Sequence, residues 1–270
     1  MKKIRMLNII YSECMRIFKQ PIIWIAIVGI AIIRFVTGFS GPDVCKLIFE
    51  FGIKEESLLC IDYMWGRASF LSYGAFGLAA LPVVGNYLED YKSGRLSMVL
   101  TRLGKRQYVF MRIIMVVLIV SICMFMGNII YMLAGHYLIG LPYASERENM
   151  VNSNLLADGQ MFAFWFVTEV QNCMQASFYA FISLGLSLFI KDSQFIIVLP
   201  MILRYFFVFL WNELNISWLP TWLSPRAIYL HNNGIFTGND IAQCLYSVVF
   251  TICIAISVAW LLYIRMRKEL

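Results

Sequence analysis

The chain has 270 residues, of which 60% are hydrophobic and 14% are charged. Soluble domains are about 45–50% apolar and about 25% charged, so this composition excludes an ordinary soluble domain. Several apolar runs approach the ~20 residues that cross a bilayer, which predicts an all-α membrane protein. The net charge of +6 comes from basic residues scattered between these runs, and this pattern reports membrane topology and predicts no nucleic-acid partner.

The first 20 residues predict a helix that lies in the headgroup plane. Apolar side chains recur at helical spacing on one face, at Ile4, Leu7, Tyr11, Cys14 and Phe18. Basic and polar side chains lie mostly on the remaining surface, as in interfacial helices. Pro21 is expected to end this helix, after which the chain turns into the bilayer. The alternative is an ordinary basic flank of the first span.

Six membrane spans are expected within a single transmembrane domain that covers residues 1–270. Their approximate bounds are 22–39, 65–87, 109–138, 161–190, 195–211 and 241–264. Only the polar stretch Lys191 to Gln194 separates the fourth span from the fifth, which predicts a tight turn there.

The basic residues predict the orientation of these spans. With the N-terminus inside, the inner segments hold fifteen of the 22 basic residues: Lys2, Lys3, Arg5, Arg16, Lys19, Lys92, Arg95, Arg102, Lys105, Arg106, Arg112, Lys191, Arg265, Arg267 and Lys268. Cytoplasmic loops carry the Lys and Arg excess in membrane proteins. We therefore expect a multi-pass protein of the cell membrane with both termini in the cytoplasm.

The inner loop between the second and third spans predicts a short amphipathic helix. Ser93 is a candidate N-cap and Gly104 suits the position after the last turn. One face carries Leu96, Val99, Leu100 and Leu103, and Arg95, Arg102, Lys105 and Arg106 surround it. Such a helix has two natural partners, the anionic leaflet and a soluble protein.

Two ionisable residues of opposite charge lie deep in predicted spans, Glu169 and Arg204. A charge at mid-helix costs about 2.5–3.5 kcal/mol on the insertion scale, and pairing would lower that cost. The two residues are therefore expected either to form an interhelical ion pair or to lie beside a substrate path. Arg34 and Arg67 fall near the outer ends of their spans, where their side chains can extend toward the interface.

The outer loop from Asn212 to Asp240 is unusually aromatic, with Trp218, Trp222 and Tyr229. Trp and Tyr prefer the membrane interface, so this loop predicts half-helices that dip into the outer leaflet. Cys45 and Cys60 fall in another predicted outer loop, and the sequence is compatible with a disulfide between them and with two free thiols.

The segment that enters the third span carries Asp90, Gly94, Leu96, Val99, Leu100, Thr101, Arg106, Tyr108 and Arg112. With these residues it resembles the permease subunits of type-2 ABC transporters. Leu103 stands where the family often has proline. The order of the interfacial helix, six spans, tight turn and outer half-helices is similar to that family over the whole chain.

The resemblance implies that the amphipathic helix is a coupling helix that docks on a separate ATPase. Its implied contact residues are Asp90, Gly94, Arg95, Leu96, Val99, Leu100, Arg102, Leu103 and Arg106. Two permease subunits and two ATPase subunits would form the complex, with lipid around it. The chain has no GxxxxGK[ST] loop and no HExxH or GxSxG motif, so ATP and Mg²⁺ would bind the partner and this chain would be no enzyme.

The implied activity is export of a hydrophobic or amphipathic substrate such as a peptide, bacteriocin, drug or lipid. The alternative is a polytopic membrane enzyme or a membrane sensor that transports nothing.

Overall fold

The computed structural model describes residues 2–39, 74–134, 137, 154–155, 158–190, 192–213 and 239–269. Within these residues the structure is helical and contains no strand, which confirms an all-α fold. The helices are α1 (Lys2–Phe18), α2 (Pro21–Phe39), α5 (Gly74–Lys92), α6 (Arg95–Leu103), α7 (Lys105–Ala134), α9 (Met161–Leu186), α10 (Ser193–Glu213) and α12 (Asp240–Glu269). The predicted outer half-helices, the Cys45–Cys60 question and Arg67 fall outside the described residues.

A helix overlaps each predicted apolar run over the part that the structure describes, although the bounds shift by several residues and residues 65–73 of the second run lie outside that part. The third apolar run was expected to begin at residue 109, but α7 begins at Lys105 because the helix continues into its basic flank. The second run was expected to end at residue 87, whereas α5 continues to Lys92. Asp90 therefore lies in the last turn of a long helix and not in a loop.

Among the described residues, two helices are by themselves long and apolar enough to cross a bilayer, α7 and the Asp240–Arg267 portion of α12. A third candidate is the pair Asn8–Phe18 and Pro21–Thr37, which bends by 66° at its break. Pro21 is the first residue of α2. This position tolerates proline because a backbone N–H there would have no hydrogen-bond partner within the helix. The helix before Pro21 therefore leaves the direction of α2, as the sequence predicted.

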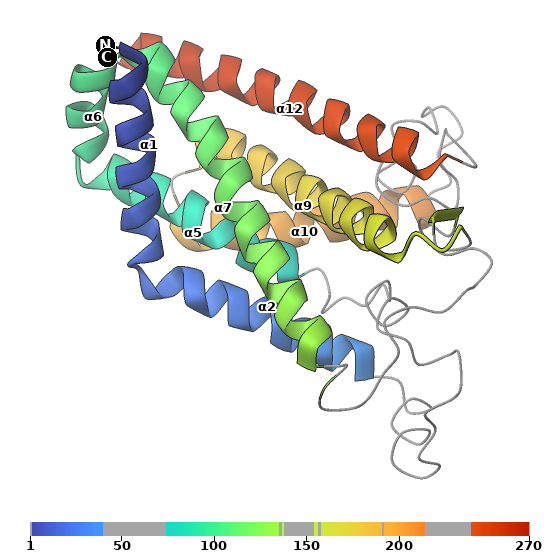
Figure 1. Ribbon diagram of the computed structural model, residues 1–270. Helices are drawn as coiled ribbons and strands as arrows, with labels where there is room; N and C mark the ends of the chain where they lie inside the picture. The colour runs from blue at the N-terminus through green and yellow to red at the C-terminus, as the bar shows by residue number, and fades with distance from the viewer. Residues whose placement is uncertain are drawn as a thin grey trace.

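The helices form one bundle, and α9 is one of its most extensively packed members. It packs against α5, α7, α10 and α12, while α2 packs against α5 and α7. The approach of α2 to α7 is close, since a Cβ on Gly127 would lie 2.7 Å from Ile30 Cγ2. Figure 1 shows α1, α6 and both chain termini at one end of the bundle, which we call the terminal end.

The outer faces of the bundle are apolar and its interior is partly polar. On α12 the exposed apolar side chains follow helical spacing at Leu245, Val249, Ile252, Ile256 and Trp260. A second exposed row runs along α2 at Trp24, Val28, Ile32 and Val36, and a third along α10 at Phe195, Val198, Ile202 and Phe206. Rows of this length are rare on soluble monomers and are compatible with contact to lipid.

Candidate functional site

The short helix α6 lies at the terminal end between α5 and α7, and two glycines define it. Gly94 precedes it with φ 73°, and Gly104 follows it with φ 77° and donates its N–H to the Leu100 carbonyl at 2.9 Å. Both residues have a positive φ, which glycine adopts at little cost. Gly104 thus ends the helix as the sequence predicted. Ser93 does not cap it, because its hydroxyl points back to the Asp90 carbonyl at 3.5 Å.

The leucine face of α6 packs onto the protein's own bundle. Leu96, Leu100 and Leu103 are 9%, 7% and 9% exposed and belong to the main hydrophobic core, with Val99 partly buried beside them. The opposite face consists of Ser97, Met98, Thr101 and Arg102, and Met98 is 65% exposed. The sequence suggested that the leucines would anchor a partner, but the structure presents this second surface outward. We call Ser97, Met98, Thr101 and Arg102 the outer face of α6.

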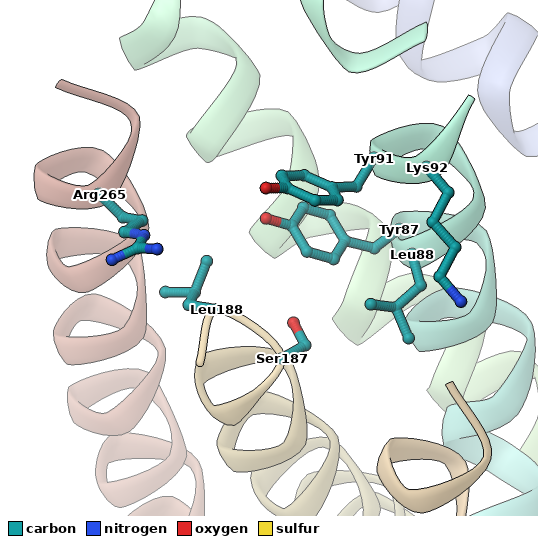
Figure 2. A pocket seen from close by; sticks show the side chains of 7 residues that line it. All are labelled: Tyr87, Leu88, Tyr91, Lys92, Ser187, Leu188 and Arg265. Carbon is teal, nitrogen blue, oxygen red and sulfur yellow. The ribbon is translucent and has the colours of Figure 1, made fainter. Parts of the chain in front are cut away.

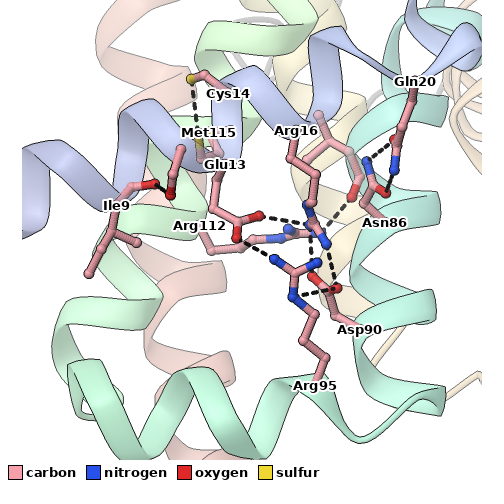
Figure 3. A network of polar contacts seen from close by, with 12 residues as sticks. Ile9, Glu13, Cys14, Arg16, Gln20, Asn86, Asp90, Arg95, Arg112 and Met115 are labelled. Carbon is pink, nitrogen blue, oxygen red and sulfur yellow. Dashed lines mark hydrogen bonds and ion pairs between the residues drawn. The ribbon is translucent and has the colours of Figure 1, made fainter.

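Four charged side chains join α6 and α5 to α1 through ion pairs (Figure 3). We call these residues, Glu13, Arg16, Asp90 and Arg95, the ion network. Arg16 donates to both carboxylate oxygens of Asp90, Nη1 to Oδ1 at 2.8 Å and Nη2 to Oδ2 at 3.1 Å. Arg16 Nη2 also lies 2.8 Å from Glu13 Oε2. Arg95 donates to Glu13 Oε1 at 2.9 Å, and its Nε lies 3.9 Å from Asp90 Oδ1. Three helices therefore meet in one set of alternating charges.

Three of the four side chains of the ion network are largely shielded from solvent, whereas Arg95 is 42% exposed. The side chains of Asp90 and Glu13 are each 13% exposed, and Arg16 is 21% exposed. Burial acts to lower the pKa of Arg16, but the hydrogen bond and charge of Asp90, together with the charge of Glu13, outweigh it and raise that pKa. Arg16 therefore keeps its charge throughout the physiological pH range, and the bidentate pair fixes the angle between α1 and α5.

Further polar contacts between α5 and its neighbours lie closer to the middle of the bundle than the ion network. Gln20 and Asn86 exchange amide hydrogen bonds, Gln20 Nε2 to Asn86 Oδ1 at 3.0 Å and Asn86 Nδ2 to Gln20 Oε1 at 2.9 Å. On α7, the buried Arg112 donates to the Val83 carbonyl, and its guanidinium carbon lies 5.2 Å from the centre of the Tyr87 ring. The residues around α6 thus hold α1, α5 and α7 together.

The predicted coupling residues divide into three groups. Asp90 and Arg95 join the ion network, while Leu96, Leu100 and Leu103 enter the core and Val99 packs against it. Arg102 is exposed on the outer face, and Arg106 is exposed with its guanidinium carbon 5.9 Å from the centre of the Tyr263 ring on α12. Gly94 is exposed at the turn before α6.

A second polar cluster lies within the bundle around Glu169, and its contacts differ from the pair that the sequence suggested. Asn128 Nδ2 donates to Glu169 Oε1 at 3.1 Å and to Oε2 at 3.0 Å. Cys173 Sγ donates to Oε1 at 3.5 Å. The charge of Arg34 also favours the ionised form of Glu169, whereas the guanidinium carbon of Arg204 lies 4.0 Å from the centre of the Phe76 ring.

Sequence reasoning missed several residues of both clusters. Glu13 and Arg16 have the i, i+3 spacing of a helical ion pair, but nothing in the sequence brought Asp90 to them. Asn128 is an amide in an otherwise apolar run, a signal that could have marked it as a partner for an ionisable residue. Arg34 was expected to extend toward the outer interface, yet it is 5% exposed and lies inside the protein.

No family model, curated protein or solved structure matches the chain. Among the described residues, no group of three or more His, Cys, Asp or Glu could hold a metal ion.

The contacts of Glu169 lead to a first prediction. Asn128→Leu is expected to destabilise the protein by about 1–3 kcal/mol, because the buried carboxylate loses its amide donor. Glu169→Leu is expected to cost a similar amount, and the double variant is expected to cost less than the sum of the two. Thermal unfolding of the purified chain in detergent measures this coupling. A larger coupling between Glu169 and Arg204 in a matched Glu169→Leu/Arg204→Leu cycle would contradict the assignment.

Proposed function

We propose that this chain is the membrane permease subunit of an ABC exporter and that the outer face of α6 docks on a separate ATPase subunit. The observation that carries the proposal is the position of α6. It is a short helix at the terminal end, fixed to α1, α5 and α7, with one face turned away from the bundle.

The fixed position of α6 supports a role in transmitting the movement of a partner subunit to the helix bundle. A helix that only touches lipid needs no rigid connection to the rest of the fold. Here the leucine face and the ion network join α6 to the ends of two long helices and to α1. A force applied to Met98 or Thr101 would therefore reach α5 and α7, which is what a subunit driven by an external ATPase requires.

The membrane placement in this proposal has six spans, α2, α5, α7, α9, α10 and α12, with the terminal end in the cytoplasm. The exposed apolar rows on α2, α10 and α12 support lipid contact. Helix α9 carries Glu169, Gln171 and Gln175 but buries all three, so it can cross the bilayer inside the bundle without exposing them to lipid. The excess of basic residues in the inner segments supports this orientation.

A second prediction tests this placement by cysteine labelling. In a background with Cys45 and Cys60 changed to Ser, an impermeant maleimide is expected to label Gln160→Cys in intact cells. It is expected to label Ser97→Cys only after the membrane is opened. Both side chains are exposed, at the start of α9 and on α6, so the difference reports the membrane and not burial. The reverse pattern would place the terminal end outside.

The transport proposal is tested by isolating the full chain from its native membrane under mild detergent. We expect it to bring with it a subunit that contains a GxxxxGK[ST] loop and hydrolyses ATP. The substrate proposed is hydrophobic or amphipathic, and a peptide, a drug and a lipid are its candidates. A polytopic membrane enzyme or sensor would be isolated without such an ATPase.

A further inference from the structure

A third guanidinium lies beside the ion network, whose two carboxylates already bind two others. It belongs to Arg112 of α7, which is 3% exposed, and Figure 3 shows its side chain directed toward Arg16. Arg112 contacts the Val83 carbonyl and the Tyr87 ring, and in the part of the chain that the structure describes it makes no ion pair. A buried guanidinium without a carboxylate is costly, and a carboxylate such as Asp90 would satisfy it better than a neutral carbonyl.

The geometry of α5 brings this guanidinium close to Asp90. Val83, Tyr87 and Asp90 are four and three residues apart, so they share one face of α5. Arg112 binds the first of them and covers the second, since its guanidinium carbon lies 5.2 Å from the centre of the Tyr87 ring. Asp90 follows one helical turn further along, a rise of about 5 Å. A change of rotamer would therefore carry the guanidinium from the Val83 carbonyl toward the Asp90 carboxylate.

Tyr108 places a second donor near the same carboxylate. It lies one turn before Arg112 on the same face of α7 and is 2% exposed. Its hydroxyl has no hydrogen-bond partner among the described residues, which is rare for a buried hydroxyl. The charges of Asp90, Glu13 and Arg16 act on it, so it lies within their reach. Two donors of α7 thus lie near a carboxylate that Arg16 of α1 holds.

We propose that Asp90 is a two-position switch that holds either α1 or α7. In the position that the structure shows, Asp90 accepts two hydrogen bonds from Arg16. In the second position α1 has moved away, and Asp90 accepts from Arg112 and from the Tyr108 hydroxyl. Detachment of α1 is then offset by a tighter contact between α5 and α7, so the two positions differ little in free energy and a partner can shift their populations. The inference depends on neither the membrane placement nor the ATPase partner.

The test follows the detachment of α1 through the alkylation rate of Cys14 in the purified full chain. Cys14 lies 3.5 Å from Met115 Sδ on α7 and becomes more accessible as α1 moves away. Tyr108→Phe removes a donor from the second position and none from the first. Alkylation is therefore expected to slow about fivefold, the equivalent of one hydrogen bond. Arg112→Met also removes a donor of the second position and should slow alkylation at least as much.

Thermal unfolding in an Arg16→Met background gives a second, independent measurement. Without Arg16, Asp90 is expected to occupy the second position, so Tyr108→Phe should lower the unfolding temperature there. In the wild type the same substitution should leave it nearly unchanged, because the hydroxyl has no partner in the first position. Tyr91→Phe is the matched control, since it removes a phenol from the residue after Asp90, on the side of α5 that lines a separate cavity (Figure 2). It should change neither the alkylation rate nor the unfolding temperature.

Unchanged or faster alkylation of Cys14 in Tyr108→Phe would overturn the proposal, because a phenol that only packs would leave α1 in place or loosen it. Equal effects of Tyr108→Phe on the unfolding temperature with and without Arg16 would also overturn it. Rates at two pH values separate detachment from a change in the pKa of Cys14, since detachment alters both rates by the same factor.

Discussion

Leu100→Asp is expected to unfold the chain or to remove at least about 3 kcal/mol of its stability. Leu100 is 7% exposed on the face of α6 that joins the main core. Truncating a buried leucine costs about 2–5 kcal/mol, and placing a carboxylate in the same apolar site adds the cost of desolvating it. The measurement is the yield and thermal unfolding of the purified chain in detergent.

Met98→Asp is the matched control for this expectation. It introduces the same side chain into the same nine-residue helix, two positions away, where the native residue is 65% exposed. Surface substitutions of this kind usually change stability by less than about 0.5 kcal/mol. Leu100→Asp that folds as well as Met98→Asp would show that the leucine face does not hold α6 to the bundle.

Asp90→Ala is expected to loosen the attachment of α1 to α5 and to cost about 2–3 kcal/mol. The substitution removes both acceptors of the Arg16 pair and leaves a partly buried guanidinium with only Glu13. Glu89→Ala removes a carboxylate from the neighbouring exposed position and is expected to have little effect.

A loosened α1 can be detected by the alkylation rate of Cys14. This thiol lies 3.5 Å from Met115 Sδ, and burial, followed by the charge of Glu13, raises its pKa above the usual value. Thiolate is the reactive form, so Cys14 of the native protein is expected to alkylate slowly at neutral pH and faster as the pH rises. In Asp90→Ala, lost burial lowers that pKa again, and alkylation at neutral pH should accelerate. Mass spectrometry of the Cys14 peptide measures the rate, and an unchanged rate would contradict the role of Asp90.

The helices could be predicted from the sequence because apolar runs and glycines are local signals. The start of α9 at Met161 and the turn at Gly104 follow directly from them. The leucine periodicity of α6 likewise predicted which side of the helix is apolar. It could not show what covers that side, because a core and a partner protein require the same leucines.

Local sequence patterns could not predict which residues far apart in the chain contact each other. Arg16 and Asp90 are 74 positions apart, and Asn128 and Glu169 are 41 apart. Opposite charge suggested Arg204 as the partner of Glu169, yet the nearest donors are an amide on α7 and a thiol on the same helix. Helix packing decides such contacts, and it depends on the whole bundle.

The most direct test of the proposed docking surface is the recovery of the ATPase with the Met98→Asp variant. The wild-type chain is expected to bring an ATP-hydrolysing subunit from the native membrane in mild detergent. Met98→Asp, with unchanged yield and unfolding temperature, is expected to recover that subunit at least about tenfold less efficiently, as for a side chain central to an interface. Undiminished recovery with the folded variant would contradict docking on the outer face of α6.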